Sequence, residues 1–273
     1  MRALNLIVFA FSFMALISAQ VLSAGAADKR EKAWGDLKEE FFENVEIADG
    51  SALLSIEAPT RAHDAAVVPV KITAKPGTRF KRLVLFVDEN PIPMAADFSF
   101  GKAAPTASFS TRVRVNSYSY IRAVAEADDG KHYMVKTFVK ASGGCSAPAS
   151  KDLAAAKAQI GRMKLRFFKP AAPASSTPQQ SGLREAQIMI RHPNTSGFQM
   201  DQVTMLYIPA HYVDHIEVRQ GEDLVMKVEG GISLSEDPNL RFFYRDTGKG
   251  EITVNASDNE DGKFSRSWPI TGS

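Results

Sequence analysis

Arg-Leu-Val-Leu-Phe-Val at residues 82–87, followed by Asp-Glu-Asn-Pro at 88–91, is the stretch that decides the fold. Aliphatic, β-branched and aromatic side chains dominate the first segment, and the second is a turn signal that ends it. This combination is typical of a short β-strand in a folded domain. Similar runs lie around it in the first half of the chain, at 66–73, 109–115 and 133–139. Asp128-Asp129-Gly130 predicts the hairpin turn before the last of them.

The second half of the chain repeats this organisation. We expect strands at 163–168, 186–191, 216–219, 224–228, 240–244, 252–255 and 265–269. Many short strands with regular turns and no long helix indicate an all-β fold of two immunoglobulin-like antiparallel sandwiches.

Three other segments lie outside this strand pattern. Trp34, Leu37 and Phe41 recur at helical spacing and predict a short amphipathic helix near the N-terminus. An Ala-rich segment at 152–159 predicts a second short helix between the two strand sets. Residues 170–182 form a low-complexity loop with little capacity to pack.

The N-terminus carries an export signal. Arg2, an apolar run and the small residues that end at Ala26 match a cleavable signal peptide over 1–26, which predicts a periplasmic protein. The apolar run is too short for a membrane span, and none is expected in the mature chain. The remaining domains are predicted at 27–145 and 162–273, joined by a linker at 146–161.

The net charge of the chain bears on which kind of partner it binds. The 273 residues carry 33 Lys and Arg against 31 Asp and Glu, a formal charge of +2. A chain this close to neutral is not expected to bind nucleic acid as its main partner.

Cys145 is the only cysteine. A lone cysteine in an exported chain indicates either a reactive thiol or an intermolecular disulfide, so a dimer linked through Cys145 stays open. A buried cysteine acting as a small hydrophobe is the alternative. Because Gly143, Gly144 and Ser146 oppose burial, we expect a flexible arm that presents the thiol to solvent.

The quoted stretch, together with other motifs, carries a resemblance to known proteins. The first half resembles the sulfur-carrier subunit SoxY, and the second half is similar to its partner SoxZ. The SoxY motifs are 66–70, 86–93, 110–114 and Gly143-Gly144-Cys145, and the SoxZ motifs are 190–193, 196–197, 208–213 and 242–244. The order matches fused SoxYZ-like carriers associated with quinoprotein dehydrogenases.

The resemblance implies a function for the lone thiol. Cys145 would carry sulfur intermediates between periplasmic redox enzymes of a sulfur-oxidising or quinoprotein dehydrogenase system, with no cofactor and no catalysis of its own. This sequence departs from the family pattern in two respects. Ser146, Ala147 and Pro148 follow the cysteine instead of terminal glycines, and the arm continues into a second domain.

Three rival interpretations of the sequence are possible. His211 and His215 have the i, i+4 spacing of metal ligands on a helix, but Pro209 and the adjoining strand make a helix doubtful, so no metal site is predicted. A Cys–His hydrolase would need Cys145 held rigidly beside a histidine. A non-covalent structural adaptor for a periplasmic dehydrogenase needs no thiol at all, since exposed strand edges permit pairing with a partner.

Overall fold

The computed structural model describes residues 30–43, 45–147, 153–168, 183–246 and 250–270. The predicted signal peptide and the loop at 170–182 lie outside these residues. The chain divides into two compact units, 1–45 and 46–273. In the first unit, residues 30–42 are helical and bury Trp34, Leu37 and Phe42, close to the predicted amphipathic stripe.

The second unit is built of strands and one short helix. The elements are β1 (Ile47–Asp49), β2 (Leu54–Glu57), β3 (Val68–Ala74), β4 (Phe80–Val87), β5 (Met94–Phe100), β6 (Phe109–Val113), β7 (Ser119–Ala127), β8 (His132–Val139), α2 (Leu153–Lys157), β9 (Met163–Phe168), β10 (Leu183–Ile190), β11 (Val213–Gln220), β12 (Asp223–Gly230), β13 (Asn239–Arg245), β14 (Glu251–Asp258) and β15 (Lys263–Pro269). The predicted all-β fold is confirmed, as are the short helix near 152–159 and the turn at 128–130.

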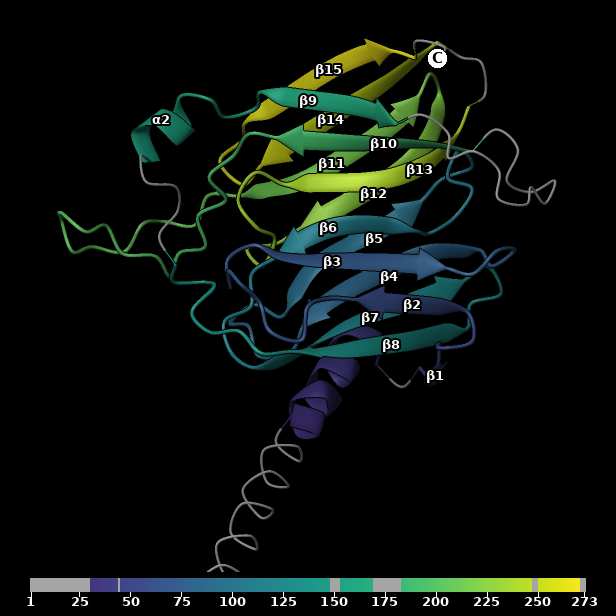
Figure 1. Ribbon diagram of the computed structural model, residues 1–273, viewed down its shortest axis with the longest axis horizontal. Helices are drawn as coiled ribbons and strands as arrows, with labels where there is room; N and C mark the ends of the chain where they lie inside the picture. The colour runs from purple at the N-terminus through teal and green to yellow at the C-terminus, as the bar shows by residue number, and fades with distance from the viewer. Residues whose placement is uncertain (1–29, 44, 148–152, 169–182, 247–249, 271–273) are drawn as a thin grey trace, which may run out of the picture. The chain divides into compact units, whose positions relative to one another are not determined.

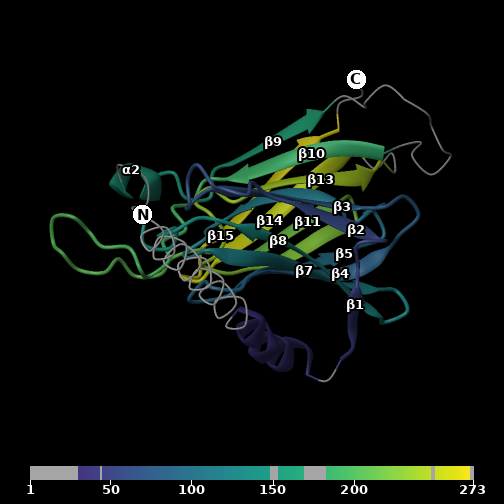
Figure 2. The ribbon, with the colours of Figure 1, turned by 60° about the horizontal axis from the view of Figure 1, so that its bottom comes forward.

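The strands form two sheets that face each other (Figure 2). The nine-stranded sheet has the order β1-β8-β7-β4-β5-β12-β11-β14-β15, and the six-stranded sheet has the order β2-β3-β6-β13-β10-β9. All the pairs are antiparallel except β1 with β8. The stretch 82–87 lies within β4, well inside the larger sheet.

Both sheets run without a break from the first half of the chain into the second. In the larger sheet β5 pairs with β12, with Phe98 opposite Val228. In the smaller sheet β6 pairs with β13, where Phe109 lies opposite Phe242. We call this line of pairing the seam. The two predicted sandwiches are therefore joined edge to edge in both sheets, which covers the four strand edges of β5, β12, β6 and β13.

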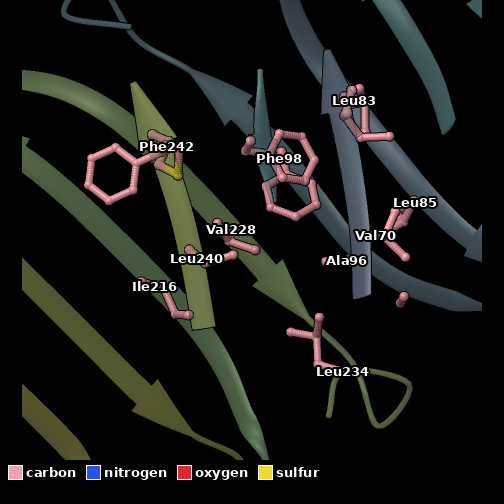
Figure 3. Packing of buried hydrophobic residues seen from close by; sticks show 14 of the residues in the cluster. Val70, Leu83, Leu85, Ala96, Phe98, Ile216, Val228, Leu234, Leu240 and Phe242 are labelled. Carbon is pink, nitrogen blue, oxygen red and sulfur yellow. The ribbon is translucent and has the colours of Figure 1, made fainter. Parts of the chain in front are cut away.

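One apolar core fills the space between the sheets on both sides of the seam (Figure 3). Val70, Leu83 and Phe98 come from the first half, while Val228 and Phe242 come from the second, and all five are 0–1% exposed. The Phe98 and Phe109 rings lie 4.1 Å apart beside the seam. Burial of side chains of this size stabilises the fold by about 1.5–3 kcal/mol each.

The turn after β4 also ties the two halves together. Asn90 Nδ2 donates to Arg114 O and to Ser233 Oγ, both at 2.8 Å, and Asn116 N donates to Asn90 Oδ1 at the same distance. Ser233 Oγ in turn donates to Ile92 O. This buried amide fixes the end of β6 against a loop from the second half. Val115 and Asn116, just after β6, accept hydrogen bonds from the glycines that precede Cys145.

The seam predicts that the two halves unfold together. A Cβ added at Gly101, just after β5, would lie 2.1 Å from Leu224 O of β12. Gly101→Ala should therefore push the strands apart and lower the free energy of unfolding by about 2 kcal/mol. Urea unfolding followed by tryptophan fluorescence and circular dichroism should show one transition with a lower midpoint.

Gly35→Ala is the matched control, because a Cβ at Gly35 meets no atom within 4 Å and the residue lies in a helix. Two separated transitions, of which Gly101→Ala moves only one, would contradict a shared seam.

Candidate functional site

Cys145 is buried, with none of its surface exposed. It lies in a short turn at 144–146, after β8 and the bridge between Arg61 and Lys140. The prediction of a solvent-exposed thiol is therefore wrong for this structure. The small residues around Cys145 let the turn fit closely against its surroundings.

The two glycines shape the turn that buries the thiol. Gly143 has a φ of 78°, in the region that favours glycine. At Gly144 a Cβ would lie 2.1 Å from Ala65 O and 2.6 Å from Val115 O, so no larger residue fits. Gly143 N donates to Asn116 O and Gly144 N donates to Val115 O, at 2.9 and 3.1 Å. The two glycines thus allow the turn to pack closely against the backbone of Ala65, Val115 and Asn116. The sequence had instead predicted that they make an exposed, flexible arm.

Arg114 is the charged residue beside the docked turn, and it is 1% exposed. Its two terminal nitrogens donate to Gly144 O at 3.1 Å and to Asn194 O at 3.0 Å. One acceptor belongs to the cysteine turn and the other to the second half of the chain. Among the described residues, no carboxylate forms a salt bridge with this guanidinium. Two backbone carbonyls accept from its terminal nitrogens, while its buried Nε has no hydrogen-bond partner there.

The second half holds the turn from the other side. Ser196 Oγ donates to Cys145 O, and Gln199 Nε2 donates to Ala147 O at 2.9 Å. Ser196 N in turn donates to Gln199 Oε1, which fixes the two side chains relative to each other. The turn that carries the thiol therefore lies between the two halves and is bonded to both.

The surroundings keep the thiol protonated. Burial raises the pKa of Cys145 to about 11, and the nearby positive charge of Arg114 offsets this only in part. The cation that acts on the thiol is Arg114. Because the thiolate is the nucleophile, the docked thiol is unreactive at neutral pH.

His192 begins the loop that contains Asn194, Ser196 and Gln199. Its ring lies 4.5 Å from that of His211, edge to face, and Asp258 lies beside both rings. His211 Nε2 is 3.1 Å from Asp258 Oδ2, and His192 Nε2 is 3.5 Å from the same oxygen. His215 lies in β11, so the i, i+4 spacing of His211 and His215 does not place the two residues on a helix.

Burial and the neighbouring His211 lower the pKa of His192 to about 4, so this ring is neutral at pH 7. Burial alone would raise the pKa of Asp258. Hydrogen bonds from His211 and from the backbone N–H groups of Gly262 and Glu260 outweigh that effect, so the pKa is lowered.

The tautomer of His192 decides what the three side chains can do. Asn194 N donates to His192 Nδ1 at 3.0 Å, so Nδ1 is unprotonated and the neutral ring carries its proton on Nε2. A protonated Nε2 faces Asp258 and cannot ligate a cation. His192, His211 and Asp258 lie close enough to surround a metal ion, but this tautomer removes Nε2 of His192 from the ligand atoms, and the hydrogen bond of the cluster joins His211 to Asp258.

An exposed apolar loop extends from the same region. It spans 198–207 and leaves Phe198, Val203, Met205, Leu206 and Tyr207 between 42% and 91% exposed. Asp201 Oδ1 stabilises its tip by accepting from Val203 N and Thr204 N. Gln199, at its base, is the residue that bonds to Ala147, so the loop and the cysteine turn are directly linked.

Sequence reasoning missed Arg114, Asn194 and Gln199 as parts of this site. Arg114 is part of the motif at 110–114, but nothing in the neighbouring sequence indicates that its side chain is buried. Ser196 was quoted in a motif without a role.

The neutral buried ring of His192 predicts a loss of stability in mild acid. Unfolded His192 takes up a proton near pH 6.5, but folded His192 does so only near pH 4. Its contribution is complete above pH 6.5 and is lost as the pH falls towards 4. His192→Gln should therefore show a smaller loss of unfolding free energy between pH 7 and pH 5 in urea titrations. His63→Gln, at an exposed histidine, should behave like the wild type. An equal pH dependence in wild type and His192→Gln would contradict this account.

Comparison with known proteins places both halves in families. Residues 38–145 match the family model for sulfur oxidation protein SoxY, and residues 174–269 match that for sulphur oxidation protein SoxZ. Together the matches span about three quarters of the chain. No curated protein matches the chain. Among the described residues, no helix has the length and apolarity needed to cross a bilayer.

Solved structures show weaker likenesses. The sulfur carrier protein SoxY from Chlorobium limicola f thiosulfatophilum is 25% identical, covering 41% of this chain and 94% of that one, with a TM-score of 0.36. A superoxide reductase (neelaredoxin) from Ignicoccus hospitalis is 14% identical over 37% of this chain and 96% of that one, with a TM-score of 0.31. The fibronectin(III)-like modules of Clostridium thermocellum CbhA are 12% identical over 79% and 91%, with a TM-score of 0.25.

The order of the two family matches agrees with the resemblance carried by the sequence motifs. The chain belongs to the SoxYZ-like proteins, with a SoxY domain and a SoxZ domain fused in that order in one polypeptide.

Proposed function

We propose that this protein is a periplasmic covalent carrier whose Cys145 holds sulfur intermediates, and that the buried turn is its resting state. The observation that carries the proposal is the position of the only thiol in a small turn, held between the two halves by a few hydrogen bonds. Such a turn can leave its site without breaking a strand pair. Export by the predicted signal at 1–26 gives the periplasmic location.

Loading requires the turn to open. The docked Sγ has no exposed surface, so neither a sulfur compound nor an enzyme can reach it. In the open state the thiol regains an ordinary pKa and forms thiolate more readily. A loaded sulfur atom and its substituents would no longer fit the buried site, so cargo keeps the turn open until it is removed.

The partners follow from this chemistry. Joining thiosulfate to a thiol releases two electrons and a proton, and a redox enzyme must take up the electrons because a thiol is not an electron acceptor for this step. SoxYZ proteins work with sulfur-oxidation enzymes, and the fused order supports periplasmic redox enzymes of that kind or of a quinoprotein dehydrogenase system.

The exposed apolar loop at 198–207 favours one second candidate, a non-covalent adaptor. Five exposed apolar side chains at one loop offer a docking surface that needs no thiol. In the host, an adaptor would keep its function with Cys145→Ser and lose it when Leu206 and Tyr207 are replaced by serine. A carrier would lose its function with Cys145→Ser.

The buried resting state predicts slow thiol chemistry that speeds up when the turn is loosened. At pH 7.5, iodoacetamide should alkylate the native protein about 10-fold or more slowly than the urea-unfolded protein. Arg114→Lys keeps the charge but cannot reach two carbonyls in the same way, so alkylation should accelerate. Arg112→Lys, at a partly exposed position of β6 just before Arg114, is the control and should match the wild type. Equal rates in all native and unfolded samples would contradict the buried resting state.

The carrier proposal also predicts a defined adduct. The Cys145 thiolate should attack a central sulfur of tetrathionate, forming Cys–S–S–SO₃⁻ and releasing thiosulfate, so that no separate oxidant is needed. Intact mass without reductant should then show one added S₂O₃ unit, which a thiol reductant removes.

Cys145→Ser should gain no mass under the same conditions. A wild-type protein that stays unmodified even in urea-loosened samples would count against a carrier thiol.

A further inference from the structure

A cavity of about 870 Å³ lies on the six-stranded sheet where it crosses the seam. Figure 1 shows the strands of this sheet facing the viewer, with β3, β6 and β13 crossing the middle. β6 has only five residues and pairs with β13 at two positions, so the sheet is narrow there. Residues from the SoxY half and from the SoxZ half both line the cavity, which we call the seam groove.

The seam groove carries a strong positive charge. Its lining includes six basic residues and one acidic residue, Glu185. The six are Lys71, Lys75, Arg79, Lys102, Arg241 and Arg245. Three of them form ion pairs: Lys71 with Glu57, Arg79 with Asp128, and Arg241 with Glu185.

Lys75, Lys102 and Arg245 have no ion-pair partner among the described residues. The neighbouring segments 169–182 and 247–249 contain no Asp or Glu, and Asp246, which follows Arg245, forms an ion pair with Arg184 at 3.7 Å. Like charges gathered on one concave surface repel each other, and a bound anion would relieve that repulsion.

The groove also offers hydrogen-bond donors and an apolar surface. Thr73 Oγ1 is buried and has no hydrogen-bond partner within the described part of the chain, and Ser110 lies on the neighbouring strand. Phe243 is part of the lining and points to the outer face of β13, because its neighbours Phe242 and Tyr244 are buried in the core. A simple inorganic ion would use the cations but leave the aromatic ring without a partner.

We propose that the seam groove binds a small organic anion with two or more negative groups on an unsaturated or aromatic body. Its volume lies in the range of small-molecule sites. The acidic groups would meet Lys75, Lys102 and Arg245, and the flat body would pack on Phe243. This binding site is separate from the carrier function, since none of the residues that hold Cys145 line it. Because both halves contribute, the bound ligand would also stabilise the seam.

Isothermal titration calorimetry with naphthalene-2,6-disulfonate as the probe tests the proposal on the full chain. The wild type should bind, and binding should weaken as salt is raised. The triple variant Lys75→Gln/Lys102→Gln/Arg245→Gln should bind about 10-fold or more weakly, since three charge contacts are lost. The charge-matched control Lys32→Gln/Lys164→Gln/Lys263→Gln changes exposed lysines outside the groove and should bind like the wild type.

Phe243→Leu keeps every charge and should weaken binding several-fold, which separates the aromatic contact from general electrostatics. Circular dichroism and the thermal midpoint establish that each variant is folded. No wild-type binding at millimolar probe, or equal binding by the two triple variants, would overturn the proposal. Sulfate binding as tightly as the disulfonate would assign a plain anion site instead. Binding of hexaglutamate that the disulfonate does not displace would assign a docking surface for an acidic protein segment. Either the sulfate result or the hexaglutamate result would overturn the proposal of an organic-anion site.

Discussion

A buried positive charge that cannot be neutralised holds this site together. The guanidinium of Arg114 stays protonated at any physiological pH, and it lies in the interior, where no carboxylate from the described part of the chain is bonded to it. An unsatisfied charge in such a position would cost several kcal/mol. The carbonyl oxygens of Gly144 and Asn194 accept hydrogen bonds from it and satisfy the charge in part. Because Gly144 belongs to the cysteine turn and Asn194 to the SoxZ half, both are bonded to the one side chain of Arg114.

The rest of the site is arranged around that requirement. Asn90 fixes the backbone of Arg114, and the seam brings the loop at 192–199 into reach. Gly144 is needed because the turn passes against two carbonyl groups, where any side chain would collide. The outcome is a thiol stored without exposed surface and with a pKa raised to about 11. Storage of this kind suits a carrier in an oxidising compartment, since it suppresses chemistry until a partner is present.

Much of the fold could be predicted from the sequence. The strands of the second half were located almost completely, because their alternating patterns are long and are separated by turn residues. In the first half β1, β2 and β5 were missed, since they are short or contain Ala and Asp, which pack well only in this sheet context. β7 was implied only by the hairpin turn at 128–130. The seam could not be predicted, because strand pairing between distant segments leaves no local pattern.

The candidate site was predicted only in part. Cys145 was identified by its chemistry, whereas its burial depends on Arg114, Ser196 and Gln199, which are distant in sequence and lack a distinctive pattern. Gly143 and Gly144 were interpreted as sources of flexibility, although two glycines serve equally well for a tight turn against backbone. The same residues therefore allow a docked turn and, in our proposal, an open arm.

Hydrogen–deuterium exchange of the amides of residues 143–147 tests this central claim most directly. In the unmodified protein, the amides of Gly143, Gly144 and Ala147 donate within the docked turn and should exchange slowly. After Cys145 takes up the S₂O₃ unit, the same amides should exchange at least about 10-fold faster, while the core strands β4 and β7 stay protected. Equal protection of the turn with and without the adduct would contradict the account, because the thiol would then carry its cargo without leaving its site.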